Sequence, residues 1–244
     1  MRLHFLGTGG YHPNERRHTA CLMLPEVGVV FDAGTSFFRV GDRLATRELH
    51  VFLTHAHLDH IAGLTYFIVP MLSGRLDRAV VYSTPEYLSA VQTHLFAQPV
   101  FPVNPGYEFR QLERHVALPG GGLLTHRRLN HPGGALGFRV DWPGKSLAYV
   151  TDTVADGSYA DFVKGVEVLI HECNFSDEGA AWAEKTGHSY TSAVARTARD
   201  AGAKRLFLTH FDPQHVEDDP ISLNTARAIF PATELAEDLM EIEF

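Results

Sequence analysis

Residues 54–60 read Thr-His-Ala-His-Leu-Asp-His and place three imidazoles and one carboxylate within six residues. The apolar run directly before them predicts a strand that delivers this motif into a loop. The spacing turns His55 and His57 to one side and places Asp59 and His60 on the following turn, within reach of a second ion. Zinc and related metals bind imidazole and carboxylate donors, and a catalytic site needs several of them. The segment is therefore interpreted as a metal-binding loop rather than a His-rich surface loop.

Composition limits the class of protein. The chain has 244 residues, of which 45% are hydrophobic and 20% charged, as is typical of a soluble globular protein. The apolar stretch at residues 64–72 is too short to cross a bilayer and contains a proline, so no membrane association is expected. Two cysteines make no disulfide framework and no signal-peptide pattern opens the chain, so a cytoplasmic location is expected. The net charge of −8 argues against nonspecific polyanion binding.

Hydrophobic periodicity and turn residues predict strands and helices that alternate along the chain, with no repeat, linker or low-complexity segment. The residues between the predicted helix at 85–96 and position 107 are rich in proline and predict a loop. The order of elements suggests a four-layered α/β sandwich. The predicted strands are 2–6, 20–24, 27–31, 49–54, 79–83, 122–130, 135–142, 146–151, 166–170 and 204–209, and the predicted helices are 60–71, 85–96, 158–164, 191–201 and 222–230, followed by a final β-like tail.

Three further residues have the chemistry and the position of metal ligands. Asp152 and His210 each follow an apolar strand, and His131 follows the strand before a Pro-Gly-Gly loop. A polar residue at the end of a buried strand can be presented at the edge of a sheet. Any one of them could be a turn residue held by backbone hydrogen bonds, but with the first motif they make a set of seven ligands.

The order His-x-His-x-Asp-His, then His, Asp and His, resembles the metallo-β-lactamase superfamily over nearly the whole chain. The segment Phe-Asp-Ala-Gly at residues 31–34 resembles an early turn of that superfamily. The resemblance implies a four-layer αβ/βα sandwich, formed by a single domain over residues 1–244, with two divalent metal ions. It assigns His55, His57 and His131 to one metal, Asp59, His60 and His210 to the other, Asp152 as the bridge and Asp32 as a residue that orients the histidines.

Two shorter segments resemble the branch that contains the tRNA 3′-processing endonucleases and their phosphodiesterase relatives. They are Ile-His-Glu-Cys-Asn at residues 170–174 and Gly-His-Ser at residues 187–189. The resemblance implies that His188 binds a phosphate oxygen or protonates the leaving group, and that Glu172 polarises His188. With Asp59 these are the candidate catalytic residues. As an alternative, His188 or the following serine caps the predicted helix at 191–201.

The expected activity is that of a phosphodiesterase in which a hydroxide bridging two metals attacks a small or cyclic phosphodiester. The acidic charge favours this substrate. So does a difference from the endonucleases that the chain resembles, which grip tRNA with a Gly/Pro/Lys-rich arm that is lacking here between His131 and His188. A tRNA 3′-end endoribonuclease and a thioester hydrolase remain alternatives, and RNA is the less favoured partner. Zinc or manganese is expected, although iron and nickel accept the same donors. The resemblance also implies a homodimer.

Overall fold

The computed structural model describes all 244 residues, which form two compact units. Unit 1 consists of residues 1–13, 17–113 and 238–243, and unit 2 of residues 14–16, 114–237 and 244. Each unit contains one mixed seven-stranded β-sheet with helices, which confirms the predicted α/β class. The prediction of a single domain over the whole chain stays a prediction.

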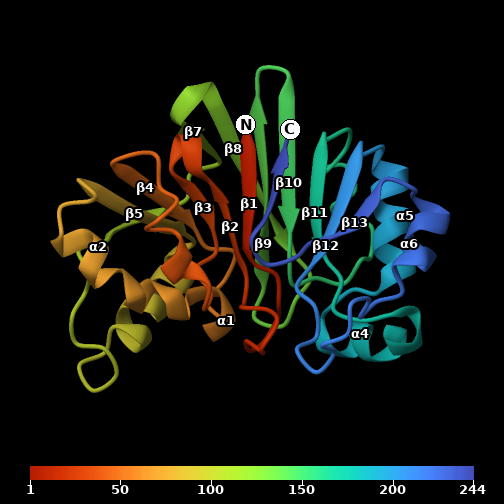
Figure 1. Ribbon diagram of the computed structural model, residues 1–244, viewed down its shortest axis with the longest axis horizontal. Coiled ribbons are helices and arrows are strands. Elements are labelled where there is room, and N and C mark those ends of the chain that lie inside the picture. The colour runs from red at the N-terminus through yellow and green to blue at the C-terminus, as the bar shows by residue number, and fades with distance from the viewer. The chain divides into compact units, whose positions relative to one another are not determined.

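The sheet of unit 1 has the strand order β14-β1-β2-β3-β4-β5-β6. The pairs from β14 to β3 are antiparallel, and the pairs from β3 to β6 are parallel. The last strand of the chain therefore returns to pair with the first (Figure 1). The bounds are β1 Arg2–Gly7, β2 Cys21–Leu24, β3 Val29–Phe31, β4 Glu48–Phe52, β5 Arg78–Ser83, β6 Glu108–Gln111 and β14 Met240–Glu243.

The helical segments of unit 1 cover one side of strands β3 to β5 (Figure 1). Ile61, Leu64 and Phe67 pack with buried valines of those strands because apolar residues recur at helical spacing. Pro85 opens α3, where its fixed φ suits the first helical position. The bounds are η1 Pro25–Val27, η2 Phe37–Arg39, α1 Leu58–Ile61, η3 Ala62–Phe67, α2 Ile68–Leu72, α3 Pro85–Ala90 and the π-helical η4 Val91–Leu95.

The sheet of unit 2 has the strand order β13-β12-β11-β10-β9-β8-β7. Pairs from β7 to β10 are antiparallel, and pairs from β10 to β13 are parallel, so the pairings follow the same sequence as in unit 1. The bounds are β7 His115–Leu118, β8 Gly122–Leu129, β9 Ala135–Trp142, β10 Lys145–Val150, β11 Val168–Glu172, β12 Arg205–Thr209 and β13 Thr233–Leu235.

Helices α5 and α6 of unit 2 lie side by side and pack on β10 to β12 (Figure 1). Val194 and Ala198 of α5 contribute to a core that also contains Leu169 and Leu206 from the sheet. Small alanines along α5 let the helix approach the strands closely. The bounds are η5 Pro119–Gly121, η6 Asp177–Gly179, α4 Ala180–Thr186, α5 Thr191–Ala201 and α6 Leu223–Ile229.

The predicted helix at 158–164 is wrong, since those residues form successive turns between Gly157 and Gly165. Their backbone hydrogen bonds mostly join residues three apart, as from Ala160 to Gly157 and from Phe162 to Tyr159, so the ladder of an α-helix does not form. Strands β6 and β7 and helix α4 were not predicted from the sequence. The other predicted elements are present within a few residues of the expected bounds, and residues 97–107 form the expected loop.

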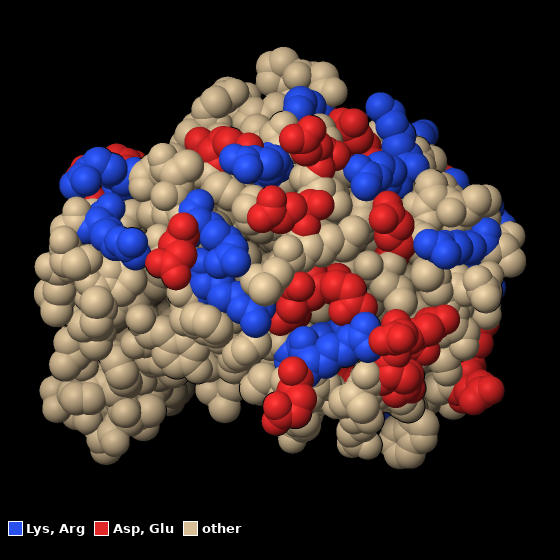
Figure 2. Space-filling model, in the orientation of Figure 1, with Lys and Arg blue, Asp and Glu red and all other residues tan.

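The surface and the helices bear on two further expectations. No helix has the length and hydropathy needed to span a membrane. On the face drawn in Figure 2, Lys and Arg side chains lie among Asp and Glu side chains, so this face presents no extended basic surface. Positive and negative side chains are therefore mixed over this face and not separated into patches of one sign.

Candidate metal centre

In unit 1 the His-rich motif follows β4 and ends in the short helix α1. His57 has extended backbone angles and precedes the helix, which contains Asp59 and His60. The imidazoles are close together, with ring centroids 4.4 Å apart for His55 and His57 and 4.2 Å apart for His55 and His60. Asp59 and His60 are buried, as is His55. The motif thus gathers four ligand-type side chains in a small volume, as its spacing predicts.

Asp32 organises this loop from the end of β3. Its carboxylate accepts hydrogen bonds from the Thr54 amide at 2.8 Å and the Thr54 hydroxyl at 3.0 Å. The Nδ1 atom of His60 lies 2.8 Å from the same carboxylate, and both side chains are fully buried. A proton on Nδ1 leaves the Nε2 lone pair of His60 available to a metal. This arrangement is the one expected for a residue that orients a ligand.

The backbone around Asp32 also fixes α1. The Ala33 amide donates to the His60 carbonyl at 2.7 Å, and the Gly63 amide donates to the Ala33 carbonyl at 2.8 Å. A Cβ at Gly63 would lie 2.2 Å from the Gly34 carbonyl oxygen, so the two segments can approach this closely only with glycine. The turn after β3 therefore holds the end of the metal-binding motif through both a side chain and the backbone.

The loop before β2 adds a contact that the sequence analysis missed. The amide of Tyr11 donates to Asp59 Oδ2 at 2.9 Å, and Tyr11 has a positive φ of 57°. Asp238 anchors the same loop, because it accepts from the amides of Thr8 and His18, each at 2.9 Å. A backbone amide can come from any residue type, so no pattern of side chains could have identified the Tyr11 contact.

In unit 2 Asp152 lies between two imidazoles. Its Oδ1 atom is 3.3 Å from His210 Nε2, and its Oδ2 atom is 3.6 Å from His131 Nε2. The three side chains are almost completely buried. Because each oxygen faces a different imidazole, the carboxylate has the geometry needed to link two ligand sets. The three residues come together although they are far apart in sequence.

His131 is oriented by the backbone of the loop before α5. Its Nδ1 atom lies 2.9 Å from the Gly187 carbonyl oxygen and donates to it, so the ring lone pair is on Nε2. Gly187 has a φ of +81°, and a Cβ there would lie 2.2 Å from Pro132 Cδ. Only glycine fits this conformation and this close approach. Gly187 thus supports the orientation of His131, a role that was not predicted from the sequence.

Glu172 is the centre of a buried hydrogen-bond network at the end of β11. Its Oε1 atom accepts from the Thr153 amide at 2.8 Å and from His188 Nδ1 at 3.0 Å. Its Oε2 atom accepts from the amides of Asn174 at 3.2 Å and Ser189 at 3.1 Å. Burial alone would raise the pKa of Glu172, but the charge and hydrogen bond of His188 hold it below its ordinary value. The carboxylate is therefore charged and fixed in place.

His188 lies beside the candidate ligands of unit 2. Its ring centroid is 5.1 Å from that of His131 and 5.6 Å from that of His210. Ligand atoms of Asp152, His188 and His210 all lie within 4.8 Å of one another. The alternative in which His188 or Ser189 caps α5 is wrong. Asp177 accepts from the Ser192 amide instead, at 2.8 Å.

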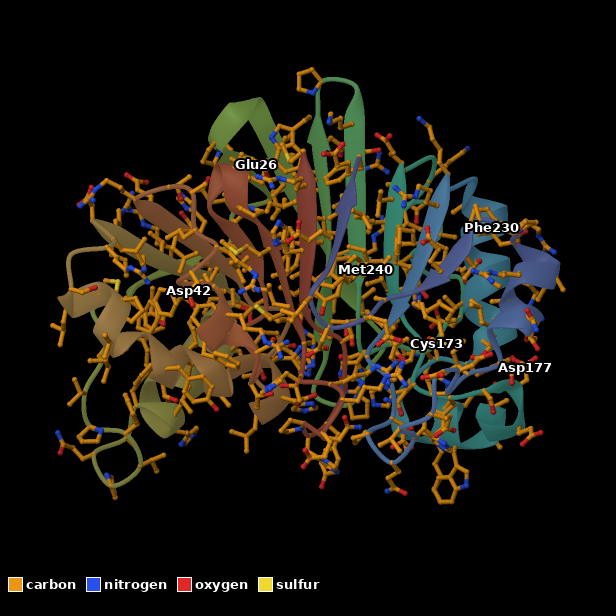
Figure 3. All side chains as sticks on the ribbon, viewed as in Figure 1. Glu26, Asp42, Cys173, Asp177, Phe230 and Met240 are labelled. Atoms are coloured by element: carbon orange, nitrogen blue, oxygen red, sulfur yellow. The ribbon has the colours of Figure 1, made fainter.

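Two neighbouring side chains have structural contacts. His171 is fully buried, with Nδ1 bonded to the Glu172 carbonyl and Nε2 2.5 Å from the Tyr159 hydroxyl. Cys173 is also buried next to Glu172, which raises the pKa of its thiol and keeps it protonated. Figure 3 labels Cys173 and Asp177 on the same side of unit 2. The buried positions of His171 and Cys173 account for these contacts without a role in catalysis.

Three of the residues at the ends of strands have left-handed backbones. The φ angles are 59° for Asp32, 49° for Asp152 and 59° for His210. Non-glycine residues adopt this region at a cost, and such residues cluster at functional sites. Each follows a strand that belongs to the parallel part of its sheet, where the chain turns sharply to leave the sheet. The turn directs these polar side chains to the carboxyl ends of the strands.

The donor chemistry of both units fits divalent metals. The candidate ligands of each unit offer imidazole nitrogens and carboxylate oxygens as donor atoms. In His60 and His131 the Nδ1 atoms are hydrogen-bonded, which presents Nε2 to an ion. Catalytic zinc sites in proteins use ligands of this kind. A His/Asp cluster of this composition indicates divalent metal binding.

Comparison with known proteins agrees with the fold. A family model described as a beta-lactamase superfamily domain matches residues 28–211. Ribonuclease Z of Acaryochloris marina is 30% identical over 306 residues, an alignment that covers 100% of this chain and 97% of that protein.

Two solved structures share the fold. The metallo-β-lactamase fold protein YhfI from Bacillus subtilis superposes with a TM-score of 0.81 at 19% identity, covering 100% of this chain and 99% of that one. The short form of human tRNase Z superposes with a TM-score of 0.76 at 22% identity, also covering 100% and 99%. The two mixed sheets flanked by helices thus match the metallo-β-lactamase α/β sandwich. The chain belongs to the metallo-β-lactamase superfamily of metal-dependent hydrolases, in the branch that contains the tRNA 3′-processing endonucleases.

Proposed function

We propose that this chain is a metal-dependent phosphodiesterase. The observation that supports this best is the pairing of buried, charged Glu172 with His188, which lies beside the candidate ligands Asp152 and His210. Hydrolysis of a phosphodiester develops negative charge on oxygen and needs a proton for the leaving alkoxide. A histidine held by a carboxylate can meet both needs.

The proposed metal ligands are four residues of the motif at 54–60 and three residues that follow strands of unit 2. Two divalent ions, with zinc or manganese expected, would supply a nucleophile at neutral pH and neutralise charge on the phosphate. The proposed ligands are His55, His57, Asp59, His60, His131, Asp152 and His210.

The residues around the ions would orient the ligands, and one of them would also transfer a proton to the substrate. Asp32 and Gly187 fix the imidazoles of His60 and His131 so that Nε2 serves as the donor. Glu172 fixes the proton of His188 on Nδ1, so the protonated ring presents a second proton at Nε2 to the substrate. The proposed role of His188 is to bind a phosphate oxygen and to give this proton to the leaving group.

The names of the curated relatives favour an RNA substrate over the small phosphodiester expected from the sequence. Ribonuclease Z from Acaryochloris marina matches over the full length of this chain. Processing of a tRNA 3′ end is therefore the first substrate to test. The small or cyclic phosphodiester stays the second candidate. The shorter length of this chain favours that candidate. The alignment with the relative spans 306 positions and this chain has 244 residues, so the relative has segments that this chain lacks.

The test of the chemistry is hydrolysis of bis(p-nitrophenyl) phosphate after metal removal and reconstitution with zinc or manganese. Wild-type protein should show turnover that depends on metal, and His188→Ala should lower kcat by about a hundredfold or more with unchanged metal content. His215→Ala is the matched control, because His215 is an exposed histidine of the same unit that pairs with Glu217. Loss of metal in His188→Ala, or full activity, would count against the proposed role.

A second assay separates the two substrates. A precursor tRNA with a 3′ extension should be cut at one position if the chain acts as its curated relatives are named. Cleavage of cyclic nucleotides with no product from precursor tRNA would favour the small substrate. Size-exclusion chromatography with light scattering in the same preparation tests the expected homodimer.

A further inference from the structure

A small apolar cavity lies against the metal-binding motif of unit 1. Its volume is about 190 Å³, and its lining includes Ala56, Leu58 and Ile61 from the motif and the start of the helix that follows. Ala56 and Leu58 occupy the positions between the ligands His55, His57 and Asp59. Neighbouring Cα atoms are about 3.8 Å apart, so the cavity begins one residue away from the proposed ligands.

The opposite wall comes from α3, η4 and the proline-rich loop. It is formed by Ala90, His94, Leu95 and Val100. Leu58 and Val100 are 70% and 65% exposed, which is unusual for large aliphatic residues that flank a recess. Residues 60–74 and 87–107 contain no Asp, Glu, Lys or Arg. The surface at the lower left of Figure 2, over this part of unit 1, is correspondingly free of charged side chains.

Size and composition indicate the kind of group that fits. Pockets for drug-sized ligands measure roughly 300–1,000 Å³, so this cavity is suited to one part of a ligand. An apolar cavity of about 150 Å³ holds a benzene molecule, which sets the scale for a single aromatic ring. His94 is the only polar residue in the lining and offers a hydrogen bond to the edge of such a ring.

From these observations we infer that the cavity binds an aromatic ring of the substrate, with a nucleobase as the natural case. This inference rests on the proposed phosphodiesterase function and narrows the substrate to phosphodiesters that contain an unpaired base. A base lies within a few bonds of the phosphate through its ribose, so a ring in this cavity suits a phosphate at the adjacent motif. Enzymes that act on nucleic acids hold an unpaired base between aromatic or apolar side chains, and this cavity offers the apolar kind.

Ala90→Phe fills the cavity and provides the test. Ala90 is partly buried at the end of α3, whereas Ser89, on the same helix, is exposed and outside the lining, so Ser89→Phe is the matched control. Saturation-transfer NMR with adenosine as the probe should detect binding to wild type and to Ser89→Phe, with no binding to Ala90→Phe. Ribose, which lacks a ring of this kind, should not bind any of the three. Equal binding of adenosine by Ala90→Phe, or none by wild type, would overturn the inference.

A kinetic arm ties the cavity to turnover. Adenosine should raise the apparent KM for bis(p-nitrophenyl) phosphate with kcat unchanged, and inhibition should be about tenfold weaker in Ala90→Phe. Absence of hydrolysis in the wild type would defeat the proposed function, while the NMR result would still decide the cavity. If Ala90→Phe does not fold, Val100→Asp replaces it, with Val103→Asp as the control because Val103 is exposed on the same loop outside the lining.

Discussion

The two units present their candidate ligands in contrasting ways, although their sheets have the same sequence of antiparallel and parallel pairs. Unit 1 takes four ligands from one contiguous motif between β4 and α1. Unit 2 takes three from positions 131, 152 and 210, each after a different strand. The contrast shows that a short motif can set local geometry, whereas scattered ligands depend on the register of whole strands. In both units a buried carboxylate, Asp32 or Glu172, orients an imidazole.

The largest expected effect comes from Asp152→Ala. Both oxygens of Asp152 face imidazoles, so its loss should remove metal from the centre. We expect hydrolysis of bis(p-nitrophenyl) phosphate to fall by more than about a hundredfold, because ligands matter more than the residues that orient them. Atomic absorption gives the metal content. The exposed Asp156→Ala is the control, and a fully metallated, active Asp152→Ala would show that the scattered ligands of unit 2 are dispensable.

Substitutions of the two orienting carboxylates should have different effects, one on metal affinity and the other on the stability of the fold. Asp32→Asn should lower metal affinity by about ten- to a hundredfold, because His60 loses the acceptor that fixes its tautomer. Glu172→Gln should leave metal content unchanged but destabilise the fold by about 1–3 kcal/mol, since an amide cannot accept from all four donors around it. Competition with a chelator and urea unfolding measure the two effects. The same phenotype in both variants would contradict the distinction.

Backbone conformation should make glycine and alanine variants differ in stability in opposite directions at one candidate ligand of each unit. His210 has a left-handed backbone, so the metal-free His210→Gly should be more stable than His210→Ala by about 1 kcal/mol. His60 lies in α1, so the order should reverse there, with His60→Ala more stable than His60→Gly by about 1 kcal/mol. Urea unfolding of the four chelator-treated variants provides the comparison. The same order at both positions would refute the argument from strain.

The smallest effect is expected away from both ligand groups, at the edge of the unit 1 sheet. Hydrogen bonds from Arg78 lower the pKa of Glu108 from 4.5 to about 2. A carboxyl group with a lower pKa in the folded state stabilises the fold above its unfolded pKa, and this stabilisation is lost as pH falls from about 4.5 to about 2. Glu108→Gln should therefore slightly lower the urea midpoint at pH 7, with the difference from wild type vanishing near pH 2. Because Glu108 is exposed and Arg78 is partly exposed, water and salt screen the pair. Glu86→Gln is the control, and a difference that persists at pH 2 would contradict the assignment.

Much of the fold was predictable because local patterns determine strands and helices. The alternating and continuous apolar runs located β4, β9 and β12, and the Pro85 and Gly202 boundaries agree with α3 and α5. The helix predicted at 158–164 failed because its backbone forms successive turns with hydrogen bonds between residues three apart, and apolar periodicity does not distinguish such turns from an α-helix. Strands β6 and β7 were missed because most of their residues are at least partly exposed, and they lack the apolar pattern of a buried strand.

The sequence by itself determined the type of chemistry, because six consecutive residues contain the imidazoles and carboxylate of a metal-binding loop. It also determined the family to which the chain belongs. Only the tertiary structure decided that Asp152 lies between His131 and His210, and that Glu172 gathers four donors from three segments of the chain. The physical reason is that these contacts depend on strand register and on backbone turns after the strands. Such long-range geometry is not encoded in any one local pattern.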